Sequence, residues 1–321
     1  MSFGIMKLKP HLAQRPWGGN RLFEMFGKET SEPGPIGESW ELSDHPDGPC
    51  TIQDGPYAGR PFGEALREIP IEMIGSSEAP AKYPLLIKYI DAAEDLSIQV
   101  HPDDAYNRKH GIEDRGKTEC WYIMDCDPGT EIVYGLKEGV ERKDLEAAIE
   151  LKTVPDCVRR IPISPGTFLY TPPGTVHAIL GGTLLCEIQQ SSNVTYRLWD
   201  WDRKPKRELH IEQALDCIDF HPSRTFEPFQ LPQDPPSVPR ITTLIHNPYF
   251  FVHAIQLAPG QSFEKPIHGP GLIVNGVAGK GTLGDQAIAE GDTFFIPACS
   301  GSVRLATDQS PLTVLLTRSN E

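Results

Sequence analysis

Three residues, His101, Glu119 and His177, have side chains that could together bind a divalent metal ion. His101 ends the run 97–101, SIQVH, whose alternation predicts a strand with Gln99 and His101 on one face. Glu119 starts the next expected strand after a polar loop. Two imidazoles and a carboxylate, with an amide oxygen available from Gln99, form a ligand set suited to Zn²⁺, Fe²⁺ or Mn²⁺. Such a set leaves coordination positions open, which is typical of a catalytic metal site.

The sequence around His177 has the form of a motif. Segment 166–181, GTFLYTPPGTVHAILG, resembles the second sequence motif of the cupin superfamily, in which Gly, Pro, Gly and His recur at fixed spacing. The four positions are filled by Gly166, Pro172, Gly174 and His177. The pattern describes a strand, a Pro-Gly hairpin and a His that the next strand presents to the interior of a barrel.

A second, incomplete copy of this motif lies near the carboxyl end. Residues 291–302, GDTFFIPACSGS, begin in the same way with Gly291 and Pro297, but Ser302 stands in the position of the His. We therefore expect two jelly-roll copies, of which only the first keeps a metal ligand. A single His is more typical of a structural role. The metal site is thus predicted from the combination of same-face pair, motif position and nearby acid.

The composition favours a folded, mainly β protein. The 321 residues allow one large domain or two modest ones, and 39% hydrophobic with 23% charged residues are ordinary globular values. Thirty-one Pro and twenty-nine Gly suit many short strands joined by turns. A net charge of −14 opposes binding to nucleic acid and to anionic membrane surfaces. The expected partner is a small molecule, and nothing in the sequence predicts an oligomeric state.

Cysteine usage and the amino terminus predict a cytoplasmic protein. The seven cysteines are scattered and include no Cys-x-x-Cys pair, so reduced thiols are expected. The first 17 residues show no signal-peptide pattern, and no stretch of 18 uninterrupted apolar residues occurs.

Hydrophobic patterning predicts strands with a few surface helices. Strands are expected over residues 85–90, 96–100 and 120–126, and helices over 141–151, 208–218 and, interrupted by Pro70, within 61–80. The Pro-rich stretch 226–240 is the expected linker. It would separate a catalytic cupin domain with helical insertions, residues 1–225, from a small cupin-like domain without metal ligands, residues 241–321.

Three long segments point to one family. They are IKYIDAAEDLSIQVHPDD (87–104), GKTE (116–119) and HAILGGTLLCEIQQSSNVTYRLWDWDR (177–203). They resemble type I mannose-6-phosphate isomerase in its short bacterial form. The similarity runs from PWGG near the start to the expected helix at 208–218, about two thirds of the chain, and is weaker after it.

This resemblance implies a set of metal ligands. The ligands of the family fall on His101, Glu119 and His177, with Gln99 at the position that supplies a fourth ligand in longer members. The implied cofactor is one Zn²⁺ per chain, with other divalent metals as alternatives. Longer members carry an Asn-His-Lys-Pro-Glu signature here. The present chain reduces it to GKTE, which keeps Lys117 and Glu119.

The resemblance also implies substrate-binding residues. The catalytic arginine of the family falls on Arg197, and the positions proposed to hold the substrate phosphate fall on Lys88 and Ser97. Arg203 stands where longer members have a Lys, which keeps the positive charge but alters the hydrogen-bond geometry. Lys88, Arg197 and Arg203 are the residues we expect to gather positive charge for a dianionic sugar phosphate.

The chemistry of the implied reaction agrees with these residues. Interconverting mannose 6-phosphate and fructose 6-phosphate requires removal of a proton next to a carbonyl, through an enediol whose oxyanion needs a metal or a cation. A free Arg almost never deprotonates, so Arg197 is expected to orient or stabilise the enediolate. The base is left open between Lys117, Glu119 and a metal-bound hydroxide. Trp17, Trp40 and Glu41 could line the pocket, but core packing is the better prediction for them.

Two other functions fit parts of the pattern. Two His and one carboxylate also form the facial triad of non-haem iron oxygenases. A non-catalytic cupin could bind sugar phosphate without turnover, and would not need Arg197. The run HAILGGTLLCEIQQSSNVTYR favours the isomerase, because nothing in an oxygenase requires it.

Overall fold

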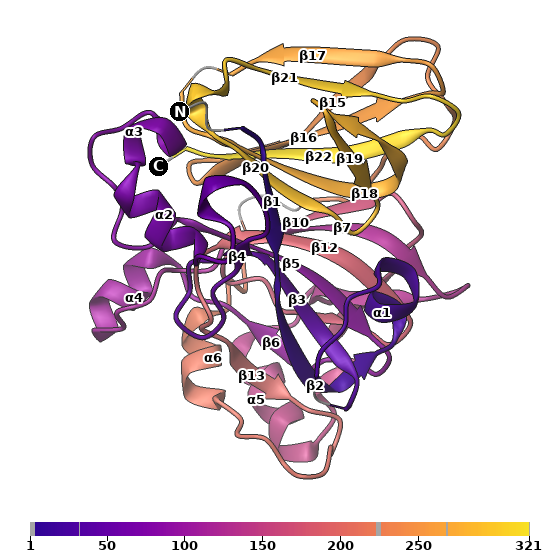
Figure 1. The fold of residues 1–321 in the computed structure, drawn as a ribbon. Coiled ribbons are helices and arrows are strands. Elements are labelled where there is room, and N and C mark those ends of the chain that lie inside the picture. Colours follow the sequence, from indigo (N-terminus) through magenta and orange to yellow (C-terminus); the bar gives the residue numbers. More distant parts are fainter. Residues whose placement is uncertain (1–3, 32, 223–225, 268, 321) are drawn as a thin grey trace.

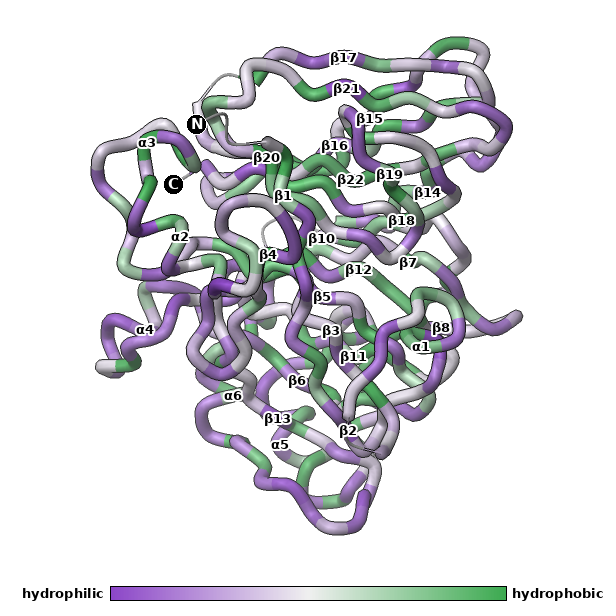
Figure 2. Tube along the Cα trace, in the orientation of Figure 1, coloured by the Kyte–Doolittle hydropathy of each residue, from purple (hydrophilic) through white to green (hydrophobic). Residues whose placement is uncertain are grey.

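The computed structural model describes residues 4–31, 33–222, 226–267 and 269–320. Strands dominate it, as expected, and all strand pairs are antiparallel. Figure 1 shows the sheets stacked in layers, with the carboxyl-terminal part of the chain forming the upper layers. In Figure 2 the hydrophobic segments follow the strands of the interior, whereas α4 (Asp104–His110) and the peripheral loops are mostly hydrophilic.

Two sheets form the lower sandwich. The seven-stranded sheet has the order β14 (Phe229–Gln230), β10 (Thr167–Thr171), β7 (Glu119–Cys126), β12 (Thr183–Gln190), β5 (Leu85–Ala92), β2 (His11–Gly19) and β3 (Ile36–Leu42). The five-stranded sheet has the order β13 (Tyr196–Trp199), β6 (Ile98–Val100), β11 (His177–Ile179), β8 (Glu131–Leu136) and β9 (Val158–Pro162). The strands predicted over 85–90, 96–100 and 120–126 are confirmed as β5, β6 and β7.

Strand alternation directs the side chains of these two sheets. On β7, Trp121 packs in one core with Ile179 of β11, so this face is turned to the five-stranded sheet. The next residue, Tyr122, packs in a different core with Phe250, on the opposite side of the seven-stranded sheet. The space between the two sheets is therefore lined by every second residue of each strand.

Helices cover the outer face of the five-stranded sheet. Leu145 of α5 (Arg142–Leu151) and Ala214 of α6 (Ile211–Cys217) lie in one apolar core with Ala178 of β11. These helices confirm the predictions at 141–151 and 208–218, the second starting three residues later than expected. A break at Ile69, directly before Pro70, separates α2 (Phe62–Glu68) from α3 (Pro70–Ile74), in line with the expected interruption. The remaining helical turns are α1 (Arg21–Phe26), η1 (Gly55–Tyr57), η2 (Val154–Asp156) and η3 (Ala298–Ser300).

The carboxyl-terminal region forms a second sandwich. One layer has the order β15 (Arg240–His246), β16 (Phe250–Leu257), β22 (Leu312–Ser319), β18 (Leu272–Leu283), β20 (Thr293–Ile296), β1 (Met6–Lys9) and β4 (Thr51–Ile52). The far half of β18 continues into the outer layer, with β19 (Gln286–Ala289), β21 (Ser302–Ala306) and β17 (Ser262–Pro266). A separate apolar core fills the space between the two layers.

The two sandwiches share strands and buried surface. β1 and β4 extend the carboxyl-terminal sheet although they come from the start of the chain. Between the sandwiches, Lys28 Nζ lies 2.7 Å from Glu41 Oε1, and Thr293 donates a hydrogen bond of 3.0 Å to Glu41 Oε2. The segment 226–240 contributes β14 to the seven-stranded sheet, so it wraps the first sandwich as well as joining the second. The division at 226–240 stays a prediction.

Two further observations concern the cysteines and the length of the helices. All seven cysteines are free, three of them buried and Cys299 exposed. Among the described residues, no helix has both the length and the apolar character needed to cross a membrane.

Candidate metal centre and active site

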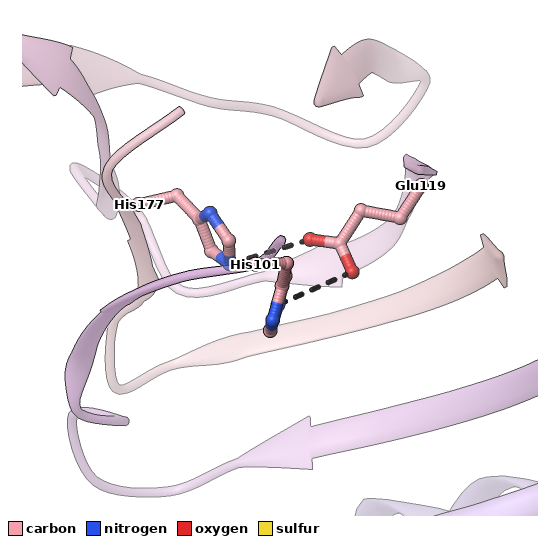
Figure 3. A group of neighbouring side chains, drawn as sticks. All are labelled: His101, Glu119 and His177. Atoms are coloured by element: carbon pink, nitrogen blue, oxygen red, sulfur yellow. Dashed lines mark ion pairs between the residues drawn. The ribbon is translucent and has the colours of Figure 1, made fainter. Parts of the chain in front are cut away.

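His101, Glu119 and His177 meet in the space between the seven- and five-stranded sheets. Their nearest ligand atoms all lie within 4.8 Å of one another, and all three residues are buried. Glu119 Oε1 lies 3.3 Å from His177 Nε2, and Glu119 Oε2 lies 3.7 Å from His101 Nε2. Figure 3 shows both imidazoles turned toward the carboxylate. The sequence-predicted ligands are thus brought together from three different strands or strand ends.

The five-stranded sheet sets these positions by register. Gln99 of β6 is paired with His177 of β11 on one side and with Arg197 of β13 on the other. Directly paired residues share a face, so the three side chains form a row across the sheet. The motif glycine Gly174 adopts φ +83°, which an L side chain rarely adopts, and its N–H donates to the His101 carbonyl over 3.0 Å. The Pro-Gly turn therefore links the segments that carry both imidazoles.

Both imidazoles are held as neutral rings with Nε2 free of a proton. The Nδ1–H of His177 donates to the Thr175 carbonyl, and that of His101 to the Val194 carbonyl, each over 2.9 Å. Burial lowers the pKa of His177 to about 4 and, with the nearby Lys117 ammonium, places the pKa of His101 well below its usual range. Both unprotonated Nε2 atoms therefore lie near the Glu119 carboxylate, and that of His101 also lies near the Lys117 ammonium. This is the tautomer in which a His binds a metal through Nε2.

The donor set fits a divalent cation. Glu119 Oε1 is fully buried and accepts no hydrogen bond from any described residue, although His177 Nε2 is its near neighbour. A carboxylate oxygen and an imidazole lone pair are both acceptors, so their approach is unfavourable unless a cation lies between them. Nitrogen and oxygen ligands of this kind suit Zn²⁺ and other first-row divalent ions.

Gln99 lies beside the three residues and can join them. Its Nε2 is 3.4 Å from His177 Nε2, and its Oε1 accepts a hydrogen bond of 3.1 Å from Ser97. A half-turn of the amide would present Oε1 to the imidazole side, and the Ser97 hydroxyl could then accept from the amide instead. Gln99 therefore stays the predicted fourth ligand.

Lys117 connects this cluster to a second buried acid. Its Nζ lies 2.8 Å from Glu119 Oε2, 3.2 Å from His101 Nε2 and 3.8 Å from Glu187 Oε1. Burial alone would lower the pKa of Lys117, but Glu119 and Glu187 outweigh it and raise the pKa above its usual value. Lys117 is therefore a charged donor beside the candidate metal site.

Glu187 is a site residue that the sequence reasoning did not assign a role. It lies on β12 and accepts a hydrogen bond of 3.2 Å from Trp121 Nε1, while its other oxygen is buried without a hydrogen bond from the described chain. Burial raises its pKa, although Lys117 opposes the shift. One signal was present in the sequence, because Glu187 is the single charged residue in the otherwise uncharged strand TLLCEIQQ.

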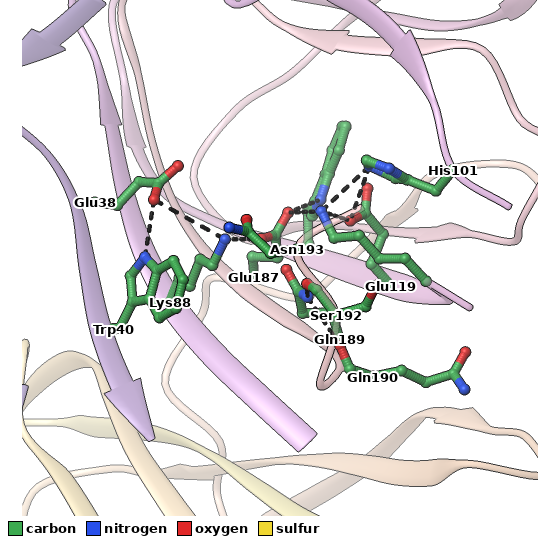
Figure 4. A network of polar contacts seen from close by, with 12 residues as sticks. Glu38, Trp40, Lys88, His101, Glu119, Glu187, Gln189, Gln190, Ser192 and Asn193 are labelled. Atoms are coloured by element: carbon green, nitrogen blue, oxygen red, sulfur yellow. Dashed lines mark hydrogen bonds and ion pairs between the residues drawn. The ribbon is translucent and has the colours of Figure 1, made fainter. Parts of the chain in front are cut away.

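Lys88 occupies the other side of Glu187. Its Nζ lies 3.8 Å from Glu187 and 4.0 Å from Glu38, and 4.6 Å from the centre of the Trp40 ring. Figure 4 shows this chain of charges running from Glu38 to His101. Burial would raise the pKa of Glu38, but Lys88, Arg15 and a hydrogen bond from Trp40 lower it to about 2.

The three amino-terminal candidates have different surroundings. Trp17 packs in the core between the two lower sheets, as expected. Trp40 is buried, but it also donates to Glu38 over 2.8 Å and contacts Lys88, so it takes part in the polar network. Glu41 is turned to the other side of the sheet, where it pairs with Lys28.

The two predicted arginines differ in whether they already form ion pairs that would compete with a substrate. Arg197 is half-buried, its guanidinium forms no ion pair with a described residue, and burial together with Arg207 lowers its pKa. Arg203 instead lies 2.7 Å from Glu94 and 3.7 Å from Asp200, and it donates to the Asp95 carbonyl. A phosphate at Arg203 would have to compete with these partners, so its role stays a prediction.

In the predicted second motif copy, Ser302 occupies the position of the metal-binding His. The hydroxyl of Ser302 donates to Glu264 over 2.9 Å, and both side chains are exposed. Within the described residues, the cluster of His101, Glu119 and His177 is the only group of His, Cys, Asp and Glu with ligand geometry.

Comparison with known proteins gives a consistent answer. A family model described as "Phosphomannose isomerase type I, catalytic domain" matches residues 5–125. The mannose-6-phosphate isomerase of Streptococcus mutans is 36% identical over 322 residues, 98% of each chain. The crystal structure of mannose 6-phosphate isomerase from Bacillus subtilis matches with a TM-score of 0.87 at 33% identity, covering 98% of this chain and 100% of that one.

A more distant structure shares the fold. It is described as mannose 6-phosphate isomerase bound with zinc and yttrium, and it matches with a TM-score of 0.73 at 18% identity over 99% of this chain and 100% of that one. The full-length identity to the nearer relatives, and not this fold likeness, establishes the relationship. The chain belongs to the type I mannose-6-phosphate isomerase family.

Proposed function

We propose that this protein interconverts mannose 6-phosphate and fructose 6-phosphate, using a divalent metal held by His101, Glu119 and His177. The observation that carries the proposal is the approach of two unprotonated Nε2 atoms to the Glu119 carboxylate, whose Oε1 accepts no hydrogen bond from a described residue. Lys117 lies next to the Glu119 carboxylate, and Glu187 lies on the other side of Lys117, so two groups able to transfer protons are close to the candidate metal site. Relatives named as this isomerase match the chain over nearly its full length.

Zn²⁺ is the proposed metal, with Gln99 as a fourth ligand and other divalent ions as alternatives. The nitrogen and oxygen set and the zinc named for a structural neighbour support this choice. When bound, the metal would polarise the carbonyl and stabilise negative charge on the oxygens of the enediol.

Glu187 and Lys117 are the proposed proton-handling residues. The reaction moves a proton between two adjacent carbons, so it needs a group that accepts the proton and returns it. Glu187 is a buried carboxylate with a raised pKa and one oxygen without a hydrogen bond, which suits a base and then an acid. Lys117, held charged by its acidic neighbours, would donate hydrogen bonds to the developing oxyanion.

Arg197 is proposed to orient the substrate and stabilise the enediolate. It extends the row of Gln99 and His177 on the five-stranded sheet and has no competing ion pair with a described residue. Lys88, Ser97 and Arg203 stay the predicted phosphate ligands. Lys88 already lies between Glu38 and Glu187, so a phosphate there would meet repulsion from two carboxylates as well as attraction to the ammonium.

The domain boundaries, and the assignment of the metal site to the first domain, are also proposals. Residues 1–225 would carry the catalytic sandwich, 226–240 the linker and 241–321 a sandwich without metal ligands. The cytoplasmic location and the absence of nucleic-acid and membrane partners remain predictions from composition.

A coupled assay on mannose 6-phosphate, run with and without oxygen, tests the activity. An isomerase needs no oxygen, so equal anaerobic and aerobic rates are expected. Turnover that stops without oxygen would support the facial-triad oxygenase instead. Tight binding of mannose 6-phosphate with no fructose 6-phosphate formed would indicate a non-catalytic sugar-binding protein.

A further inference from the structure

We propose that Asp114 is a positioning residue that holds the loop 192–194 against the candidate metal site, and thereby fixes the orientation of His101. This inference rests on the metal site of the proposed function. Asp114 lies outside that site, in the polar loop before Lys117. Its influence would reach His101 in three steps, each made of hydrogen bonds that involve the main chain.

The first step joins His101 to the loop. The Nδ1–H of His101 donates to the Val194 carbonyl over 2.9 Å, and this hydrogen bond leaves Nε2 unprotonated toward Glu119. Val194 lies in the short connection between β12 and β13. Because a carbonyl on a connection is only as fixed as the connection itself, the orientation of the imidazole depends on what holds this loop.

The second step joins the loop to Asp114. One carboxylate oxygen of Asp114 accepts from the main-chain N–H of Asn193 over 2.8 Å. The other accepts from Lys82 Nζ and from the main-chain N–H of Arg115, each over 3.1 Å. His45 Nε2 lies 3.5 Å from the first oxygen. Burial opposes ionisation, but the contacts with His45, Asn193 and Lys82 hold the pKa of Asp114 well below its usual range.

The third step ties the loop to the segment that carries Lys117 and Glu119. The hydroxyl of Ser192 donates to the Arg115 carbonyl over 2.8 Å and accepts from the Val194 N–H over 3.3 Å. Asn107 donates to the carbonyls of Asp114 and Arg115 over 2.9 Å and 2.7 Å. Figure 4 shows Ser192 and Asn193 beside the polar network. The support of His101 and the entry into β7 are thus held by one set of hydrogen bonds.

The donors around Asp114 make its charge necessary. Lys82, Asn193 and Arg115 all present N–H groups to the two oxygens. An Asn of the same shape has one acceptor oxygen and one NH₂ group, so it would turn a donor toward at least one of these donors. Asp114→Asn should therefore loosen the loop with little change in packing volume.

The test measures Zn²⁺ affinity by competition with a chromophoric chelator, in the full-length protein. In Asp114→Asn the dissociation constant for Zn²⁺ should rise about 10- to 100-fold, the usual effect of losing a group that supports a metal ligand. In the metal-free protein, the Nδ1–H resonance of His101, assigned with His101→Gln, should shift or exchange faster with water. Ser192→Ala should change both readouts in the same direction, by less.

Asp234→Asn is the matched control. Asp234 also pairs with a cationic side chain, Arg240, at 3.1 Å, but it is 75% exposed and lies in the segment 226–240. It should leave both readouts unchanged. Wild-type Zn²⁺ affinity and an unchanged His101 resonance in Asp114→Asn and Ser192→Ala would overturn the inference, even if thermal stability fell. A protein that binds Zn²⁺ through His101 but does not isomerise mannose 6-phosphate would overturn the proposed function alone.

Discussion

The Nε2 atom of His177 lies 3.3 Å from Oε1 of Glu119, and no hydrogen lies between them because the ring proton is on Nδ1, held by the Thr175 carbonyl. Both atoms are hydrogen-bond acceptors that repel each other, and a bound cation would remove this repulsion. The five-stranded sheet provides one of them and the seven-stranded sheet the other. The candidate metal centre therefore forms where the two sheets pack face to face.

Removing one imidazole should remove the metal. In His177→Ala the remaining His101 and Glu119 supply too few ligands, so metal content and isomerase activity should be lost together. Metal analysis of the purified variant, with the coupled assay, checks this. His221→Ala, which changes an exposed His outside the site, is the control. Stoichiometric metal and full turnover in His177→Ala would show that the ligands are assigned wrongly.

Glu187→Gln should separate chemistry from metal binding. The amide keeps the shape of the side chain and the Trp121 contact but cannot accept a proton, so the turnover number should fall by about 10²- to 10⁴-fold. Metal content and the Michaelis constant should change little. Glu227→Gln, at a 70% exposed acid paired with Arg159, serves as the control. Near wild-type turnover in Glu187→Gln would move the proton-transfer role to Lys117.

Lys88 and Arg197 should affect different steps. Loss of a phosphate contact at Lys88 should raise the Michaelis constant for mannose 6-phosphate, with a cost of roughly 1.5–3 kcal/mol for a charge-assisted hydrogen bond. Arg197→Ala should mainly lower the turnover number, because a cation beside the reacting carbons acts most when charge develops there. Steady-state kinetics on both variants, with metal content verified, decide this.

Unphosphorylated mannose gives the control for Lys88. A phosphate ligand affects only the phosphorylated substrate, whereas a lysine that merely separates Glu38 from Glu187 affects both sugars. Equal losses on mannose and mannose 6-phosphate in Lys88→Ala would contradict phosphate binding at this residue.

The sequence predicted the closeness of His101, Glu119 and His177 better than it predicted the polar network around them, for a physical reason. Gln99 and His101 follow from alternation within a few residues, and His177 follows from a local turn motif with a glycine at φ +83°. The contacts of Glu187 with Lys88 and Lys117 depend instead on which strands are neighbours in the sheet. The local hydrophobic pattern of a segment does not indicate which distant strand it pairs with.

Long-range pairing also explains the other differences. Arg203 has the position of a phosphate ligand by counting, but its ion pair with Glu94 joins segments about a hundred residues apart. Strand β1 joins the carboxyl-terminal sheet from the start of the chain, which composition alone could not predict. The outward contact of Ser302 with Glu264 arises from the pairing of β21 with β17, and the absence of a metal ligand at this position stays a prediction.

Glu38 should make stability depend on acid pH. Its pKa is about 2 in the folded protein against 4.5 for the free side chain, so its ion pairs stabilise the fold fully above about pH 4.5 and are lost as the pH falls toward 2. The contribution is at most roughly 3 kcal/mol. Urea unfolding at several pH values should show a steeper loss of stability below pH 4.5 in wild type than in Glu38→Gln. Parallel curves would contradict this.

Lys28 should stabilise the contact between the two sandwiches. Lys28→Met leaves Glu41 buried without its cation and should lower the free energy of unfolding by about 3–5 kcal/mol, and the double change with Glu41→Gln should recover part of the loss. Lys143→Met, at a 74% exposed lysine paired with Glu141, should have a small effect. Equal stability of the two single variants would show that the buried pair is not needed.

The most direct test of the metal-dependent isomerase is a titration of metal-free protein. The protein is stripped with a chelator, Zn²⁺ is added in steps, and bound metal and conversion of mannose 6-phosphate are measured on the same samples. We predict that activity is absent at the start, rises in proportion to bound metal and reaches its plateau at one ion per chain. Full activity in protein with no bound metal, or a plateau that requires two tightly bound ions, would contradict the account.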